Sequence, residues 1–133
     1  MEETRVMVVD DEAIVCDRLR EHLEKNNLRV TTFTDSREAL AALEEGHFHV
    51  VVTDLKMAGA TGLDVLHNIR QRGQPTQVII ITGYGSMEAA REAETVGAYD
   101  FVCKPFELKD LTKKVKRAAK RARRGVGLLA TEG

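Results

Sequence analysis

Residues 50–54 have the sequence Val-Val-Val-Thr-Asp, a run of β-branched residues that ends in a carboxylate. Two further apolar runs lie on either side of it along the chain, Val-Met-Val-Val at 6–9 and Val-Ile-Ile-Ile at 78–81. Continuous runs of this kind are typical of strands that are buried on both faces of a parallel sheet. We therefore expect central strands over residues 6–9, 50–53 and 78–82.

Segments 28–33 and 99–103 mix polar with apolar residues, which favours half-exposed strands at the edges of the sheet. Amphipathic stretches with apolar residues at helical spacing lie between the strands. A helix cap is predicted at Asp35, with Glu38 three residues on, and another at Ser86. The expected helices cover residues 12–25, a segment that begins after Asp35, and residues 62–71, 86–95 and 107–123.

This β-α alternation, repeated five times, predicts an α/β fold with helices on both faces of a five-stranded parallel sheet. With three buried strands in the centre and two at the edges, the strand order is 2-1-3-4-5, the flavodoxin-like (βα)5 arrangement of a doubly wound sheet. A length of 133 residues suits one domain. We expect the domain over residues 1–122 and a linker stub or appended tail over 123–133.

The composition, 43% hydrophobic and 31% charged, is that of an ordinary soluble globular protein. No apolar run is long enough to span a membrane and the start resembles no signal peptide, so a cytoplasmic protein is expected. Cys16 and Cys103 form no C-x-x-C pair, which favours thiols in a reducing compartment. The histidines show no metal-ligand spacing and are expected at surface or boundary positions; they are His22, His47, His49 and His67.

Polar residues follow four of the predicted strands directly. Asp10 and Asp11 follow the first strand, Asp54 the third, Thr82 the fourth and Lys104 the fifth. Ligands of open α/β sheets bind beyond the carboxyl ends of the strands, so these side chains should meet at one rim. Each alone has an ordinary explanation as a helix cap, a turn residue or a solvated charge. Their joint placement at four strand ends favours a functional site.

The residue types at this rim suit phosphoryl transfer. Three neighbouring carboxylates repel one another unless a cation binds, and oxygen ligands with room for water suit Mg²⁺. A lysine and a threonine hydroxyl would neutralise and bind phosphoryl oxygens, and positioning with charge neutralisation supplies most of the catalysis in such reactions. A carboxylate can itself act as the nucleophile and carry the phosphoryl group.

Residues 4–122 resemble the receiver domains of bacterial two-component response regulators. The resemblance rests on four segments that are specific in combination: Val-Val-Asp-Asp-Glu at 8–12, Val-Thr-Asp-Leu-Lys-Met at 52–57, Ile-Thr-Gly-Tyr-Gly at 81–85 and Gly-Ala-Tyr-Asp-Phe-Val-Cys-Lys-Pro-Phe at 97–106. It implies a phosphoacceptor switch that takes a phosphoryl group from a histidine kinase or phosphotransfer protein. The domain would control an output domain or partner and catalyse only its own phosphorylation and dephosphorylation.

The resemblance also implies residue roles. Asp54 would be the phosphoryl acceptor, and Asp54, Asp11 and the backbone carbonyl of Lys56 would bind Mg²⁺, with Asp10 acting through a water. Lys104 would pair with the phosphoryl oxygens.

Further implied roles concern switching and the lifetime of the phosphoryl group. Thr82 would swing toward the phosphoryl group while Phe101 turns inward, and the Lys104–Pro105 peptide would be cis. Lys56 and Tyr84 would tune the lifetime of the phosphoryl group.

The stretch 113–124 carries eight Lys or Arg residues and no acid. The favoured interpretation is the solvated face of the last helix. A second is a homodimer through helix 86–95, strand 5 and the last helix, with cations facing the acids of a neighbour's helix. Direct contact with nucleic acid is not expected, because no recognition helix or stacking aromatics accompany the charge.

Three rival functions fit this sequence less well than a receiver domain does. A nucleotide or flavin module is disfavoured because the G-x-G at 83–85 follows the fourth predicted strand and lacks a third glycine. An aspartyl-phosphate hydrolase usually has a second Asp two residues after the nucleophile, where Lys56 stands. A receiver that is no longer phosphorylated is disfavoured by the complete set of polar rim residues.

Overall fold

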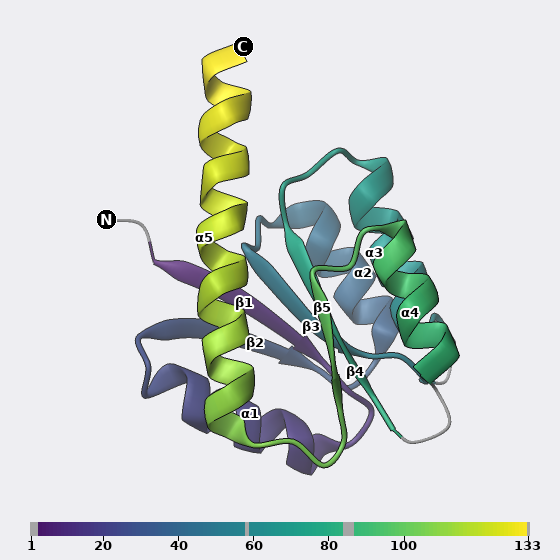
Figure 1. The fold of residues 1–133 in the computed structure, drawn as a ribbon. Coiled ribbons are helices and arrows are strands. Elements are labelled where there is room, and N and C mark those ends of the chain that lie inside the picture. The colour runs from purple at the N-terminus through teal and green to yellow at the C-terminus, as the bar shows by residue number, and fades with distance from the viewer. Residues whose placement is uncertain (1–2, 58, 84–86, 133) are drawn as a thin grey trace.

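A computed structural model describes residues 3–57, 59–83 and 87–132. Five parallel strands form one sheet with the order β2-β1-β3-β4-β5 (Figure 1), which confirms the predicted topology and both edge strands. The strands are β1 (Thr4–Val9), β2 (Leu28–Phe33), β3 (Val50–Asp54), β4 (Gln77–Thr82) and β5 (Asp100–Cys103).

Each strand is followed by a helix, and the helices cover both faces of the sheet, as Figure 1 shows. α1 and α5 pack on one face, and α2, α3 and α4 pack on the other. The helices are α1 (Ala13–Glu24), α2 (Ser36–Glu45), α3 (Gly62–Gln71), α4 (Met87–Val96) and α5 (Leu108–Glu132). The expected cap at Asp35 is present, since its carboxylate accepts a hydrogen bond from the backbone N–H of Arg37 at 2.8 Å. The expected cap at Ser86 lies outside the described residues.

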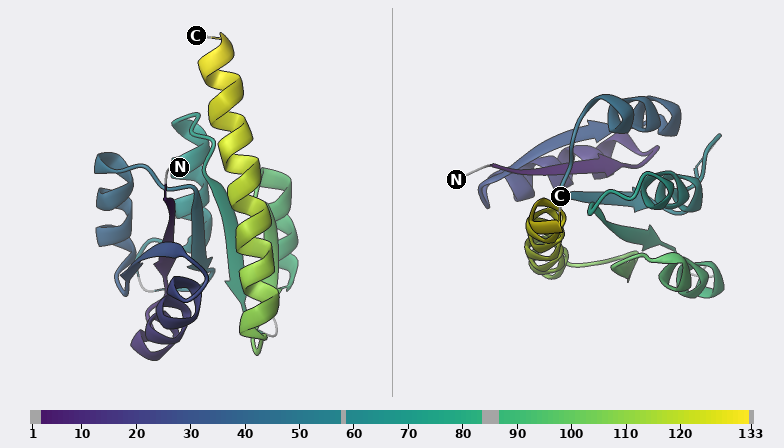
Figure 2. Two further views of the ribbon diagram at one scale, coloured as in Figure 1. Left: turned by 90° about the vertical axis from the view of Figure 1, so that its left-hand side faces the viewer. Right: turned by 90° about the horizontal axis from the view of Figure 1, so that it is seen from above.

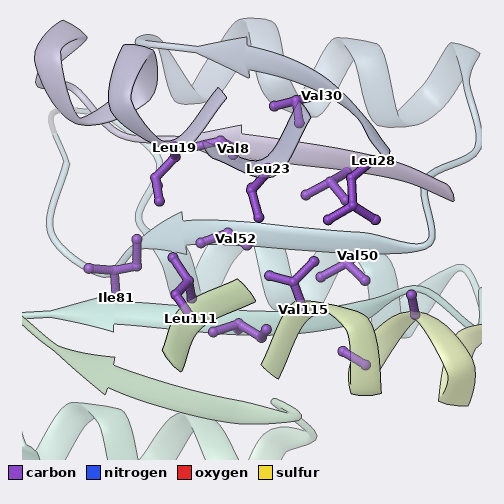
Figure 3. Close-up of a cluster of buried hydrophobic side chains, with 14 of the residues drawn as sticks. Val8, Leu19, Leu23, Leu28, Val30, Val50, Val52, Ile81, Leu111 and Val115 are labelled. Carbon is purple, nitrogen blue, oxygen red and sulfur yellow. The ribbon is translucent and has the colours of Figure 1, made fainter. Parts of the chain in front are cut away.

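The sheet is buried because side chains alternate between two hydrophobic cores. Val6, Val8, Val50 and Val52 point toward α1 and α5, into the core that Figure 3 shows in close-up. The intervening strand residues, such as Val51, belong to the core beneath α2, α3 and α4. Complete burial of one such aliphatic side chain contributes about 1.5–3 kcal/mol. The three central strands therefore form a rigid support for the loops at their carboxyl ends.

The last helix is longer than the sequence analysis predicts. It continues to Glu132, whereas the expected helix ends at residue 123, and it extends past the end of the sheet (Figure 2). Gly125 permits this continuation, because a Cβ at this position would lie only 2.7 Å from Cβ of Pro75. A glycine costs about 1 kcal/mol in a helix, but here it lets α5 pass close to the loop before β4.

His49 differs from its expected surface or boundary position. It is only 5% exposed, and its Nδ1 accepts a hydrogen bond from the backbone N–H of Arg5 at 3.0 Å. A buried backbone N–H needs an acceptor, and the imidazole supplies one beside the start of β1. His49 therefore has a structural role at the end of the sheet opposite the polar rim.

Candidate functional site

The strand register brings the predicted rim residues to one edge of the sheet. Val9 pairs with Thr53, and Asp54 pairs with Ile81, so β1, β3 and β4 end at nearly the same level. Thr82 in turn pairs with Cys103 at the end of β5. Because all strands are parallel, the residues that follow them project into the same space.

Lys104 connects the carboxylates from two strands. Its Nζ lies 3.1 Å from Oδ2 of Asp10 and 3.1 Å from Oδ2 of Asp54, although the two residues are 44 positions apart in sequence. It also lies 3.8 Å from Oε1 of Glu12. One ammonium group thus partly neutralises three acids at the rim.

Asp10 is fully buried, which is unusual for a carboxylate. Its Oδ1 accepts the backbone N–H of Glu12 at 2.9 Å, and its carbonyl accepts the Cys16 thiol at 3.3 Å. Burial raises the pKa of Asp10, and the lowering effects of the Glu12 N–H and of Lys104 do not offset it. The ionised form of Asp10 is therefore costly, so the site favours additional positive charge.

The pKa of Lys104 is raised as well. Burial lowers the pKa of the ammonium group, but its hydrogen bonds to Asp10 and Asp54 and their negative charges outweigh this effect. The pKa of Asp10 is raised for a different reason, because desolvation of this fully buried carboxylate exceeds its stabilisation by the lysine. Lys104 therefore remains charged at neutral pH, but its single positive charge does not balance the negative charges of the rim carboxylates.

Asp10, Asp11 and Glu12 form a cluster in which one carboxylate oxygen of each lies within 4.8 Å of the others. Asp11 and Glu12 are exposed, whereas Asp10 lies beneath them. The sequence analysis assigned no role to Glu12. Its position directly after two aspartates at a strand end was the available signal for a third acid at this rim.

Asp54 is held with its carboxylate toward the rim. Its Oδ1 accepts the backbone N–H of Lys56 at 3.2 Å, and its side chain is 12% exposed. Thr82 is fully buried at the end of β4, and its hydroxyl donates to the carbonyl of Gly83 at 3.2 Å. Phe101 is half-buried and packs against the core on the side of α2, α3 and α4. The Lys104–Pro105 peptide bond is cis.

Comparisons with known proteins identify the family to which this chain belongs. The family profile described as the response regulator receiver domain matches residues 6–116, which is most of the chain. The chain belongs to the response regulator receiver family. Receivers act as phosphoacceptor switches in two-component signalling, and this chain is such a domain.

Individual relatives agree with the family assignment. The receiver is 36% identical over 117 residues to the transcriptional regulatory protein FixJ of Bradyrhizobium diazoefficiens, covering 88% of this chain and 57% of FixJ. It is 37% identical over 113 residues to the DNA-binding transcriptional regulator NtrC of Salmonella typhimurium, covering 85% of this chain and 24% of NtrC. The chain thus spans only part of the length of these curated relatives.

Solved structures share the fold of this receiver. A response regulator receiver domain protein from Clostridium thermocellum superposes with a TM-score of 0.85 at 31% identity, covering 90% of this chain and 97% of that one. The isolated domain FixJ-N superposes with a TM-score of 0.82 at 33% identity, covering 90% of this chain and 96% of that one. The receiver fold is therefore shared over nearly the whole length of these proteins.

The oxygen-rich rim of the receiver fits a hard divalent cation. Mg²⁺ prefers carboxylate and carbonyl oxygens and keeps several waters, and the exposed carboxylate of Asp11 lies beside the buried Asp10 at an open surface. Burial raises the pKa of Asp10, so its ionised form is stabilised when positive charge is added nearby. Of the two positions expected to influence phosphoryl lifetime, Lys56 is exposed and Tyr84 lies outside the described residues.

Proposed function

We propose that Asp54 is the phosphoryl acceptor of this receiver. The observation that carries the proposal is the hydrogen bond of 3.1 Å between Lys104 Nζ and Oδ2 of Asp54. This hydrogen bond orients the Asp54 carboxylate at the partly exposed rim, beside the Lys104 ammonium group, which can pair with an incoming phosphoryl oxygen. Asp10 also contacts Lys104, but it is completely buried and therefore poorly accessible to a phosphodonor.

The reaction would be a transfer from a phosphohistidine to Asp54. A carboxylate oxygen of Asp54 attacks phosphorus, the phosphorus–nitrogen bond breaks, and the imidazole leaves with the electron pair and takes up a proton. The product is an acyl phosphate on Asp54. Lys104 would stay near the new phosphoryl oxygens, and Thr82 would donate its hydroxyl to one of them after leaving the Gly83 carbonyl. These contacts would offset the added negative charge.

The proposed Mg²⁺ ligands are carboxylates of Asp11 and Asp54 and the backbone carbonyl of Lys56, with Asp10 acting through a water. When bound, the ion would neutralise negative charge on the carboxylates and the transferring phosphoryl group. The support for this set is the cluster of acidic oxygens at the rim and the raised pKa of Asp10.

We infer that the phosphodonor is a sensor histidine kinase or a phosphotransfer protein. A surface cleft of about 640 Å³ lies beside the rim, with Lys104 in its wall and with Val15, Phe106 and Leu108 as apolar lining. Ile14, on the adjoining α1, is a large hydrophobic side chain that is 57% exposed. An apolar surface beside the acceptor suits a protein partner better than a small phosphodonor.

The proposed output surface consists of α4, β5 and α5. Phe101 and Thr82 would change their positions on phosphorylation and alter this surface, which would then act on an output domain or partner. A homodimer is one arrangement of the surface, because α4 exposes acids and α5 exposes cations. The acids are Glu88, Glu92 and Glu94, and the cations are Arg117, Arg121 and Arg124. A rise in molar mass by light scattering after phosphorylation, reduced by Arg121→Glu, would support the dimer.

We also infer that Lys56 and Tyr84 tune the lifetime of the phosphoryl group on Asp54.

We infer a cytoplasmic location, as the proposed two-component partner implies. Within the described ranges, none of the helices has the length and hydropathy that a bilayer-spanning segment requires. Cys16 and Cys103 are not joined in a disulfide, which is compatible with a reducing compartment.

The test of the acceptor is incubation with a small phosphodonor and Mg²⁺, followed by intact-mass analysis. Wild-type protein should gain one phosphoryl group, and Asp54→Ala should gain none. Lys113→Ala, which removes an exposed cation of α5 and leaves the rim side chains unchanged, is the matched control and should be labelled like wild type. Equal labelling of wild type and Asp54→Ala would place the modification at another residue.

A further inference from the structure

Gly62, the first residue of α3, lies against the backbone of the proposed acceptor. A Cβ at this position would lie 2.5 Å from the carbonyl oxygen of Asp54 and 3.0 Å from Cα of Leu55. The N–H of Gly62 donates to the carbonyl of Leu55 at 3.0 Å, which keeps the two segments in contact. Both close neighbours are backbone atoms, so no side-chain rotation could make room for a methyl group.

The requirement at Gly62 concerns space and not backbone conformation. Gly59, Gly73 and Gly97 have positive φ, a conformation that favours glycine, whereas Gly62 is outside that group. Its backbone is therefore accessible to other residues, and only the contact with Asp54 and Leu55 excludes a side chain.

Neither side of this contact can move away easily. The first turn of α3 is fixed by a capping box, in which Asp64 Oδ2 accepts the N–H of Thr61 at 2.7 Å. Farther along α3, Val65 and Ile69 are fully buried in the core. On the other side, the N–H of Leu55 donates to the carbonyl of Ile81 at 3.0 Å and continues the pairing of β3 with β4.

We propose that Gly62 is a positioning residue for Asp54, holding its peptide so that the carboxylate faces Lys104. This inference rests on Asp54 being the phosphoryl acceptor. An added methyl group would displace the Asp54 peptide, and the carboxylate would move relative to Lys104 and the other rim acids. Reactions that depend on positioning are sensitive to such shifts, since a misplacement of about 1 Å can cost a factor of about 100 in rate.

The experiment compares Gly62→Ala with Ile69→Ala, which removes buried atoms two turns farther along α3 and leaves the contact at Gly62 unchanged. Three quantities are measured: melting temperature, phosphorylation rate with a saturating small phosphodonor and Mg²⁺, and Mg²⁺ affinity from amide chemical shifts. Gly62→Ala should be phosphorylated about tenfold more slowly and should bind Mg²⁺ more weakly. Ile69→Ala should lose thermal stability but retain the wild-type rate and affinity below its melting temperature.

The inference is overturned when Gly62→Ala loses stability yet keeps the wild-type rate and Mg²⁺ affinity. Should Gly62→Ala not fold, Thr61→Ala tests the same contact by freeing the first turn of α3 without adding an atom. A reduced rate then supports the inference, and an unchanged rate overturns it. Failure of the acceptor assignment would give a different result, because wild type would then be unlabelled or Asp54→Ala would be labelled equally.

Discussion

Lys104 and Asp10 form one ion pair but are expected to contribute to stability with opposite signs. The lysine gains from two carboxylates, whereas the fully buried Asp10 loses hydration that a single shared ammonium does not replace. Removing one partner of a buried pair is usually destabilising, but neutralising a buried charge can be stabilising where its desolvation penalty exceeds the Coulombic gain from its partner. The two residues are therefore expected to respond in opposite directions to neutralisation.

Asp10→Asn should stabilise the receiver at neutral pH without divalent ions. The pKa of Asp10 is higher in the folded state than its unfolded value near 3.8. Protonated Asp10 therefore favours folding, and this contribution to stability is complete below the unfolded pKa and is lost as pH rises through the folded pKa. Above that pKa the buried charge opposes folding. We expect a melting temperature higher by roughly 3–8 °C at neutral pH, with the gain shrinking as pH falls toward the unfolded pKa. A gain independent of pH would contradict this explanation.

Lys104→Gln should destabilise the metal-free receiver, because it leaves two rim carboxylates without their shared cation. Urea unfolding with a chelator present should show a loss of roughly 1–3 kcal/mol. Saturating Mg²⁺ should recover part of it, since the ion replaces the missing positive charge. Lys113→Gln, at an exposed position of α5, should change stability by less than about 0.5 kcal/mol. Equal losses with and without Mg²⁺ would argue against a shared electrostatic site.

At the scale of single residues, the rim could be predicted because each polar group directly follows a strand with a clear apolar pattern. Glu12 and Gly62 show the limit of such reasoning. Glu12 reaches Lys104 only through the fold, and the close contact of Gly62 with Asp54 is a packing distance that no spacing in the sequence encodes.

At the scale of elements, α3 and α4 differ in how firmly they are anchored. α3 buries Val65, Leu66 and Ile69 completely, whereas the fully buried side chain described for α4 is Ala93. Small side chains bury little apolar area, so α4 should open more easily than α3. This difference suits α4 for a signalling surface that changes during phosphorylation.

Hydrogen exchange should detect this difference. Backbone amides of α4 (Met87–Val96) should exchange about tenfold faster than those of α3 in the unphosphorylated protein. Addition of Mg²⁺ with a phosphoryl mimic should change exchange within residues 83–106, while α2 on the same face of the sheet serves as an internal control. Unchanged exchange throughout 83–106 would refute the proposed signalling surface.

The helices and strands themselves were predicted well where local pattern decides them. Strand 28–33 and helix 62–71 have the predicted limits, because apolar periodicity, caps and turns coincide there. The predicted end of the last helix, at residue 123, was wrong, because α5 reaches Glu132 by continuing through Gly125. Its close approach to Pro75 is a tertiary contact, and the sequence pattern contains no sign of it.

At the scale of the whole molecule, the fold is a rigid parallel sheet that delivers polar residues from four strands to one rim. The sheet order followed from the alternation of elements and the contrast between buried and edge strands. Family membership is shown by the match over residues 6–116. The central claim that joins fold and function is that Asp54, among the rim carboxylates, carries the phosphoryl group.

The most direct measurement locates the phosphoryl group on the chain. Protein treated with a small phosphodonor and Mg²⁺ is reduced with borohydride, which converts an acyl phosphate into the corresponding alcohol, and is then analysed by peptide mass spectrometry. The account predicts homoserine at position 54 and intact aspartates at positions 10 and 11. Reduction at Asp10 or Asp11, with Asp54 unchanged, would contradict it.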